Sequence, residues 1–138
     1  MSTGIHSQPA AAPLARDGLE VFRALAAPGD TPPWEVIGDL APGLGAHIRH
    51  GLGALVGDAG LDLRTRELTT VCMLAALGDC GPQLAFHAAG ALRAGATTTE
   101  VVQAIAQVAL YAGIPRTLNA LAAARPVLDA LAEADSRS

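Results

Sequence analysis

The chain has 138 residues, which is enough for one domain with its own hydrophobic core. Its formal net charge is −4 and it has no cluster of Lys or Arg, so its charge pattern excludes a typical nucleic-acid binder. No apolar run reaches the ~20 residues of a membrane-spanning helix. The first residues, MSTGIHSQPAAAP, lack the features of a secretory signal. We therefore expect a cytoplasmic protein with no membrane partner and with reduced thiols.

The composition favours close helix packing and self-association. Hydrophobic residues make up 51% of the chain, aromatic residues only 3%, and there are 15 glycines. Small apolar side chains let helices approach closely. So much apolar surface exceeds the need of one small domain, which predicts a homo-oligomer.

The periodicity predicts an all-α, single-domain fold of about six helices. Residues 1–12 read as a disordered N-terminal arm, followed by a helical domain over residues 13–134. No alternating strand pattern is present. Pro126 is expected to kink or divide the last helix. The helices are expected over 14–27, 42–56, 63–77, 82–94, 98–113 and 115–132, with a short one from Pro33 to Ile37.

Capping residues mark several of these boundaries. Asp62 is a predicted N-cap for the helix from residue 63, and Gly78 ends that helix by allowing a left-handed backbone. Thr97 or Thr98 caps the helix near residue 98, with Glu100 in its first turn as in a capping box.

His87 is the most informative polar residue, because it interrupts the apolar stretch AFHAAGAL. Gln83 lies four residues earlier and shares its helix face. Gly90 and Ala91 are expected to keep that face open to a pocket. A histidine there suits proton transfer near neutral pH, and the alternative is a buried histidine bonded to a carbonyl group.

The two cysteines differ in their surroundings. Cys80 precedes the helix start at Pro82, where unpaired N–H groups favour a reactive thiolate. Cys72 falls in the apolar stripe of the preceding helix and is expected to be an inert core thiol. Their spacing is not that of a CxxC motif.

Two further pairs offer polar groups for a ligand. Gln107 and Tyr111 are four residues apart and share one helix face. They either line a pocket together or form an ordinary contact of an amphipathic helix. Arg66 and Glu67 form either a buried pair or a solvated helix start, and their position at a helix N-terminus favours the solvated start.

A metal site is not expected. His47 and His50 lie three residues apart in HIRH, so they could share a face, but no carboxylate or third ligand accompanies them.

Together these motifs resemble the carboxymuconolactone decarboxylase family, within the alkylhydroperoxidase-D-like superfamily. The resemblance covers about residues 40–128. The residues that carry it are LDLRTREL at 61–68, AALGDCGPQLAFH at 75–87, GAT…E at 95–100 and QVALYAGIP at 107–115.

The resemblance implies an all-helical fold assembled as trimers or as hexamers of trimers, with sites near subunit contacts. The peroxidase-like branch carries CxxCxxxH with an upstream glutamate. Cys80 matches its first cysteine and Glu67 its glutamate, but Gln83 replaces the second cysteine. A dithiol cycle needs that second thiol, so we do not expect a CxxC peroxidase. The decarboxylase branch has Glu-Leu-x-x-His, where this chain has Gln83 to His87.

The predicted function is that of a cofactor-free lyase or isomerase acting on a small carboxylated or lactone-type metabolite. His87 would act as general acid and base, Gln83 would orient it or bind a substrate oxygen, and Tyr111 would donate a hydrogen bond. The predicted substrate-binding residues are Arg66, Glu67, Gln107 and Cys80. Two alternatives stay open: a non-catalytic oligomer that binds a ligand or partner, and a single-cysteine thiol redox protein using Cys80.

Overall fold

Helices account for every regular element in the computed structural model, which describes residues 16–138. The all-α prediction is confirmed. The predicted arm over residues 1–12 lies outside the described residues, as does the beginning of the first predicted helix. The elements are α1 (Gly18–Leu25), α2 (Pro33–Ile37), the 3₁₀ turn η1 (Gly38–Leu40), α3 (Pro42–Gly51), the π-helical segment η2 (Leu52–Val56), α4 (Leu63–Leu77), α5 (Gly81–Arg93), α6 (Thr98–Gln107), α7 (Ala109–Ala112) and α8 (Ile114–Asp135).

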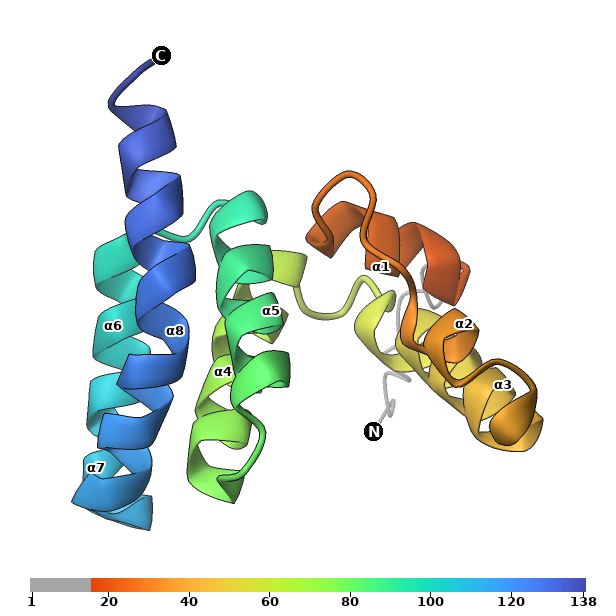
Figure 1. Cartoon of the computed structure of the whole chain (residues 1–138), viewed down its shortest axis with the longest axis horizontal. Coiled ribbons are helices and arrows are strands. Elements are labelled where there is room, and N and C mark those ends of the chain that lie inside the picture. The colour runs from red at the N-terminus through yellow and green to blue at the C-terminus, as the bar shows by residue number, and fades with distance from the viewer. Residues whose placement is uncertain (1–15) are drawn as a thin grey trace, which may run out of the picture.

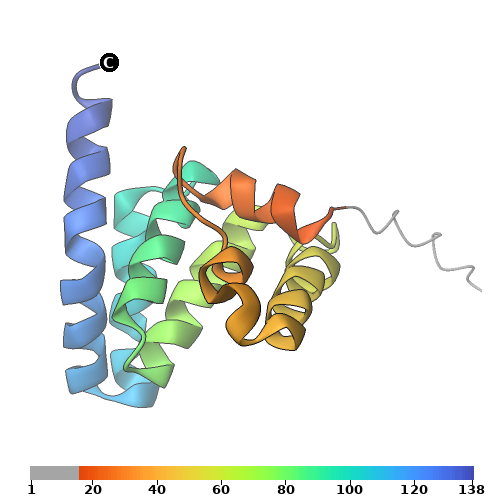
Figure 2. The same ribbon diagram turned by 45° about the vertical axis from the view of Figure 1, so that its right-hand side comes forward.

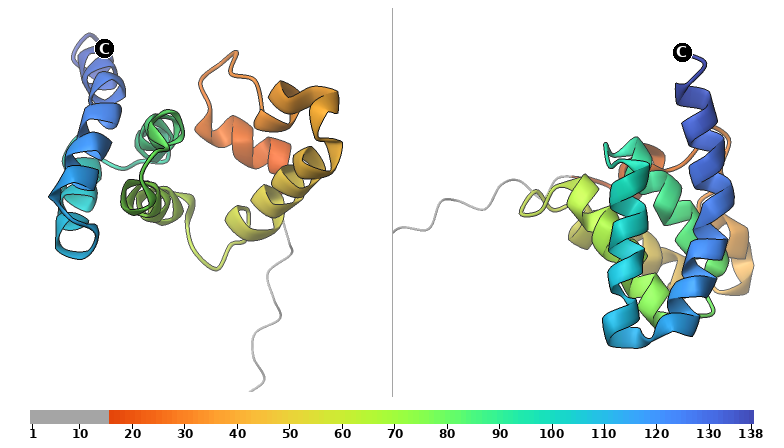
Figure 3. Two further views of the ribbon diagram at one scale, coloured as in Figure 1. Left: turned by 60° about the horizontal axis from the view of Figure 1, so that its bottom comes forward. Right: turned by 90° about the vertical axis from the view of Figure 1, so that its left-hand side faces the viewer.

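The helices form three groups in space (Figure 1). The α4–α5 hairpin lies in the middle, with α6, α7 and α8 on one side and α1, α2 and α3 on the other. The long α8 packs against α4, α5 and α6, while α1 packs against α5 and η2. Figure 2 shows α1 crossing above α3, and the right view of Figure 3 shows α6 and α8 side by side.

The predicted caps set the ends of the central helices. The Asp62 carboxylate accepts from the backbone N–H of Thr65 at 2.8 Å and caps α4. Gly78 ends α4 with a φ of +78°, in the left-handed region. At α6 the Thr97 hydroxyl and the Glu100 carboxylate each accept from the other residue's backbone N–H, which completes a capping box.

The main core lies between the hairpin and the C-terminal helices. Alanines on α5 and α8 let these two helices approach closely around larger aliphatic side chains of α4 and α6. Its buried members include Val71, Ala75, Leu84, Ala88, Ala91, Val101, Ile105, Ala120, Ala124 and Leu128.

The C-terminal helices differ from the prediction in two respects. Pro126 does not divide the last helix, because α8 runs without interruption from Ile114 to Asp135. Proline has no N–H, so Pro126 leaves the carbonyl oxygen of Ala122 without its helical hydrogen-bond donor. Both residues are exposed, so water can donate to that oxygen instead. The helix predicted over 98–113 is split into α6 and α7 at Val108.

Within residues 16–138, the helices are all too short or too polar to cross a lipid bilayer.

Candidate active site

A glutamate and a histidine meet between the two helices of the central hairpin. Glu67 lies in the second turn of α4 and His87 in the middle of α5. The short segment from Gly78 to Cys80 reverses the chain, and Nδ1 of His87 comes within 2.7 Å of Oε2 of Glu67. The expectation of a solvated helix start is therefore wrong for Glu67, which is only 1% exposed.

Gly90 makes room for this contact. A Cβ atom at position 90 would lie 3.0 Å from Oε2 of Glu67 and 3.4 Å from Leu25. The space that we expected to open beside His87 is thus occupied at Gly90 by the Glu67 carboxylate.

The buried carboxylate has one unused oxygen. Oε1 of Glu67 is buried and has no hydrogen-bond partner among the described residues. A buried polar atom without a partner carries a free-energy cost, so it is normally kept for a water, a ligand or a functional role. The His87 side chain, by contrast, is 22% exposed, so the pair connects a buried carboxylate to the surface.

This arrangement suits proton transfer. An ionised carboxylate only accepts hydrogen bonds, so a histidine bonded to one through Nδ1 carries its proton on that atom. The other ring nitrogen, Nε2, is then free to take a proton from a substrate, and the imidazolium that forms is stabilised by Glu67.

Aromatic side chains pack beside the histidine. The rings of Phe86 and His87 are nearly perpendicular, with centroids 5.1 Å apart. Phe22 of α1 stacks on Phe86 at 5.6 Å, and Trp34 meets the edge of Phe22 at 5.8 Å. Sequence analysis missed the packing of Phe22 and Phe86 beside His87, because no local pattern indicates which helix faces meet.

No hydrogen bond within residues 16–138 joins the predicted site residues Gln83, Gln107 and Tyr111 to the buried pair. Gln83 is exposed on α5, although it lies one turn before His87. Gln107 is exposed at the end of α6, and Tyr111 on α7 is 89% exposed. The partner of the His87 ring is Glu67 rather than Gln83.

Arg66 holds the loop before α4. Its guanidinium donates to the carbonyl oxygens of Leu61 and Asp58, each at 3.0 Å, and lies 3.8 Å from the Asp58 carboxylate. Arg66 therefore does not pair with Glu67, and its described contacts are structural.

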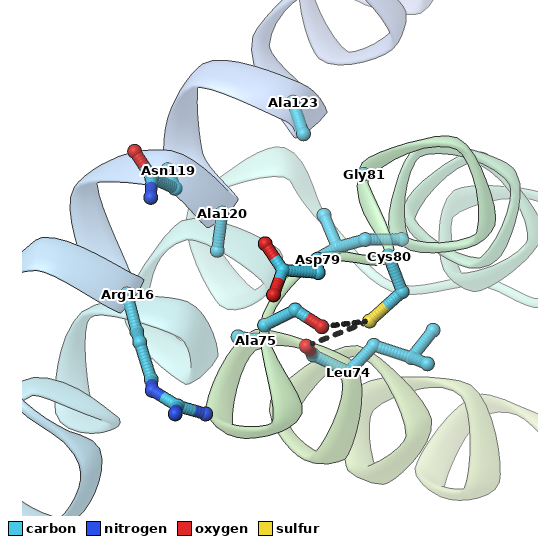
Figure 4. A pocket seen from close by; sticks show the side chains of 11 residues that line it. Leu74, Ala75, Asp79, Cys80, Gly81, Arg116, Asn119, Ala120 and Ala123 are labelled. Atoms are coloured by element: carbon cyan, nitrogen blue, oxygen red, sulfur yellow. Dashed lines mark hydrogen bonds between the residues drawn. The ribbon is translucent and has the colours of Figure 1, made fainter.

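Cys80 lies in a separate cavity of about 260 Å³ between the hairpin turn and α8 (Figure 4). Its thiol donates to the carbonyl oxygens of Leu74 and Gly78 at 3.2 and 3.1 Å. Asp79 and Arg116 also line this cavity, and Arg116 donates to the last carbonyl groups of α4. The thiol is thus engaged as a hydrogen-bond donor to backbone rather than paired with His87.

Cys72 is expected to react more slowly than a free cysteine. Its Sγ atom lies 3.2 Å from the carbonyl oxygen of Ala104, and burial raises the pKa of the Cys72 thiol. Because the thiolate is the nucleophile, less of it is present at a given pH, and labelling should reach half its maximum rate only above the ~8.5 of a free cysteine. Iodoacetamide labelling of Cys80→Ser, which leaves only Cys72, measures this midpoint.

The matched variant is Cys72→Ser, which leaves only Cys80. Labelling of Cys72 at the rate of a free thiol near pH 8 would contradict the prediction. Faster labelling of Cys80 than of a free thiol at neutral pH would favour the thiol alternative.

No group of three or more His, Cys, Asp or Glu side chains gathers as a metal-binding cluster in residues 16–138. His47 and His50 are both exposed on α3.

The fold and the buried pair define an all-α protein with a buried Glu–His pair built on a helical hairpin. The model of the carboxymuconolactone decarboxylase family matches residues 42–126, more than half of the chain. The chain therefore belongs to the carboxymuconolactone decarboxylase family.

A curated relative comes from Paracoccus denitrificans and is described as an uncharacterized 15.0 kDa protein in the nqo9-nqo10 intergenic region. It is 38% identical over 69 residues, which cover 49% of this chain and 52% of the relative. The chain thus matches about half the length of that relative.

Proposed function

We propose that the protein is a cofactor-free lyase or isomerase that acts on a small carboxylated or lactone-type metabolite, with Glu67 and His87 as its proton-transfer pair. The observation that carries the proposal is the 2.7 Å contact between Nδ1 of His87 and a carboxylate that is 1% exposed. A histidine held in this way can both take and return a proton, so the chemistry needs no cofactor.

In an isomerisation, Nε2 of His87 takes a proton from a carbon next to a carbonyl group. In a substrate with a β,γ double bond, the electron pair of that C–H bond moves into the carbonyl to form a dienolate. The protonated ring returns the proton to the γ-carbon, which moves the double bond next to the carbonyl group. In a decarboxylation, His87 begins as the imidazolium, with its Nε2 proton taken from solvent. The bond to the carboxylate carbon breaks, its electron pair forms the enolate as CO₂ leaves, and Nε2 gives its proton to carbon. Glu67 stabilises the imidazolium during either reaction.

Five other predicted residues belong to this proposal as candidates: Gln83 and Tyr111 as catalytic residues, and Arg66, Gln107 and Cys80 as substrate-binding residues. Three of them, Gln83, Gln107 and Tyr111, lie on exposed surfaces of the single chain, where a second subunit could bring them to a site. Exposed apolar side chains at the end of α4 and on α7 and α8 support a homo-oligomer, as a trimer or hexamer. These side chains are Leu77, Leu110, Tyr111, Ile114 and Leu118.

The test compares wild type with His87→Ala on a panel of lactone acids and small carboxylated metabolites, by CO₂ release and by uptake of deuterium from D₂O at carbon. We expect His87→Ala to lose about 100-fold or more of any turnover found. His47→Ala is the matched control, because His47 is an exposed histidine on α3, and it should retain the wild-type rate. Equal turnover by His87→Ala and wild type would remove His87 from this role.

A second candidate is a non-catalytic oligomer that binds a ligand or partner, favoured by the amide at Gln83 where the decarboxylase branch carries a carboxylate. It predicts tight binding of a carboxylated ligand without conversion, which calorimetry on the same panel would detect.

A further inference from the structure

The first described helix reaches the buried pair through a row of rings. Trp34, Phe22, Phe86 and His87 follow one another with centroid separations of 5.8, 5.6 and 5.1 Å. Phe22 and Phe86 are close to parallel, with 12° between their planes, and Phe22 is only 6% exposed. Phe22 therefore covers one face of Phe86 and leaves that ring little freedom.

Independent contacts fix α1 at both ends, against α5 at its C-terminal end and against α3 at its N-terminal end. The guanidinium of Arg93 donates to the carbonyl oxygen of Leu25 at 2.8 Å. Leu25 is 1% exposed and lies beside Gly90, next to the Glu67 carboxylate. At the other end of α1, Asp17 accepts two hydrogen bonds from Arg49, at 3.0 and 2.6 Å. The ring of Phe22 is thus held in place from both ends of its helix.

We propose that Phe22 is a positioning residue, which acts through Phe86 to hold the His87 ring in the orientation that presents Nδ1 to Glu67. This inference rests on the proposed function, because it concerns the same pair. The torsion that turns an imidazole about its Cβ–Cγ bond has broad minima, so packing rather than an intrinsic rotamer decides the ring orientation. Of the rings in the row, Phe86 alone contacts His87, and Phe22 limits where Phe86 can go.

Phe22 lies outside the part of the chain that the family model matches, which begins at residue 42. The orientation of a histidine within the matched part thus depends on a helix that precedes it. Phe22→Leu removes the ring and keeps an apolar side chain. Val21→Ala is the matched control, because Val21 is equally buried on α1 but lies against Gly57, 3.2 Å from the position of a Cβ there.

The experiment is NMR of protein labelled with ¹⁵N in its histidine rings, at a pH above the ordinary histidine range of ~6.5, where the tautomer can be read from the ring nitrogens. Wild type is expected to show His87 with its proton on Nδ1. Phe22→Leu should increase the Nε2–H form of His87 several-fold, whereas Val21→Ala should leave the tautomer unchanged even if it lowers the melting temperature.

Phe86→Leu removes the other phenylalanine ring of the row, on α5. It should also increase the Nε2–H form of His87, and it serves as the test if Phe22→Leu does not fold. A wild-type tautomer in both folded variants, or an Nε2–H ring already in wild type, would overturn the inference. The readout needs no substrate. Absence of turnover combined with a Phe22-dependent tautomer would therefore count against the proposed function and not against the positioning role.

Discussion

Glu67→Gln is expected to lower turnover by roughly 10²- to 10⁴-fold while the protein stays folded. The glutamine has the shape of the glutamate but no charge, so it does not stabilise the imidazolium. Its NH₂ group can also donate to Nδ1 of His87, which would place the ring proton on Nε2, the atom that must act as base. The measurement is the initial rate on the substrate found for wild type, with circular dichroism as a check of folding.

Glu20→Gln is the matched control, because it makes the same chemical change at an exposed position on α1 and should keep the wild-type rate. The Glu67→Gln variant also tests the reaction with less disturbance of the fold than His87→Ala does. The His87→Ala variant leaves a buried carboxylate without its single described partner. A Glu67→Gln rate within a factor of two of wild type would show that the carboxylate has no part in the reaction.

Gly18→Ala is expected to destabilise the fold by about 3 kcal/mol, the upper end of the usual cost of overpacking. A Cβ at position 18 would lie 2.0 Å from the carbonyl oxygen of Arg49, and this obstacle is backbone that cannot rotate away. The helix α1 would have to move off α3 and η2. Urea unfolding, followed by circular dichroism, measures the change in the free energy of unfolding.

Gly43→Ala provides the matched control within α3. No atom lies within 4 Å of a Cβ built there, and the φ angle of Gly43 is outside the left-handed region that favours glycine. Alanine at a helical position usually stabilises by about 0.5–1 kcal/mol, so this variant should unfold at a higher urea concentration than wild type. Identical midpoints for the two variants would contradict the close crossing of α1 over α3.

The helices could be predicted because their signals are local. The helix caps depend only on residues three or four positions away in the sequence. Those predicted at Asp62, Gly78 and Thr97 all mark helix ends in the structure. Pro126 does not divide the last helix, because the cost of a proline depends on what faces the freed carbonyl, and an exposed helix surface reduces that cost. Such surroundings are a property of the fold and not of the neighbouring sequence.

The site could be predicted only in part, for the same reason. His87 stood out because it is polar in an apolar stretch. Its partner Glu67 lies 20 residues earlier and looked like an ordinary helix-start carboxylate, so only the family resemblance indicated it. The helix period correctly placed Gln83 near His87 along α5, but it could not show that Glu67 of α4 fills the space at Gly90.

The position of α1 also affects where a shortened fragment of this protein should begin. Similarity to the family begins at residue 42, whereas Phe22 and Leu25, which pack beside the Glu67–His87 pair, come earlier. A fragment cut to residues 42–126 would keep both members of the pair and lose the helix that shields them. The first residue of the family match and the first residue that packs beside the Glu67–His87 pair therefore fall at different places in this chain.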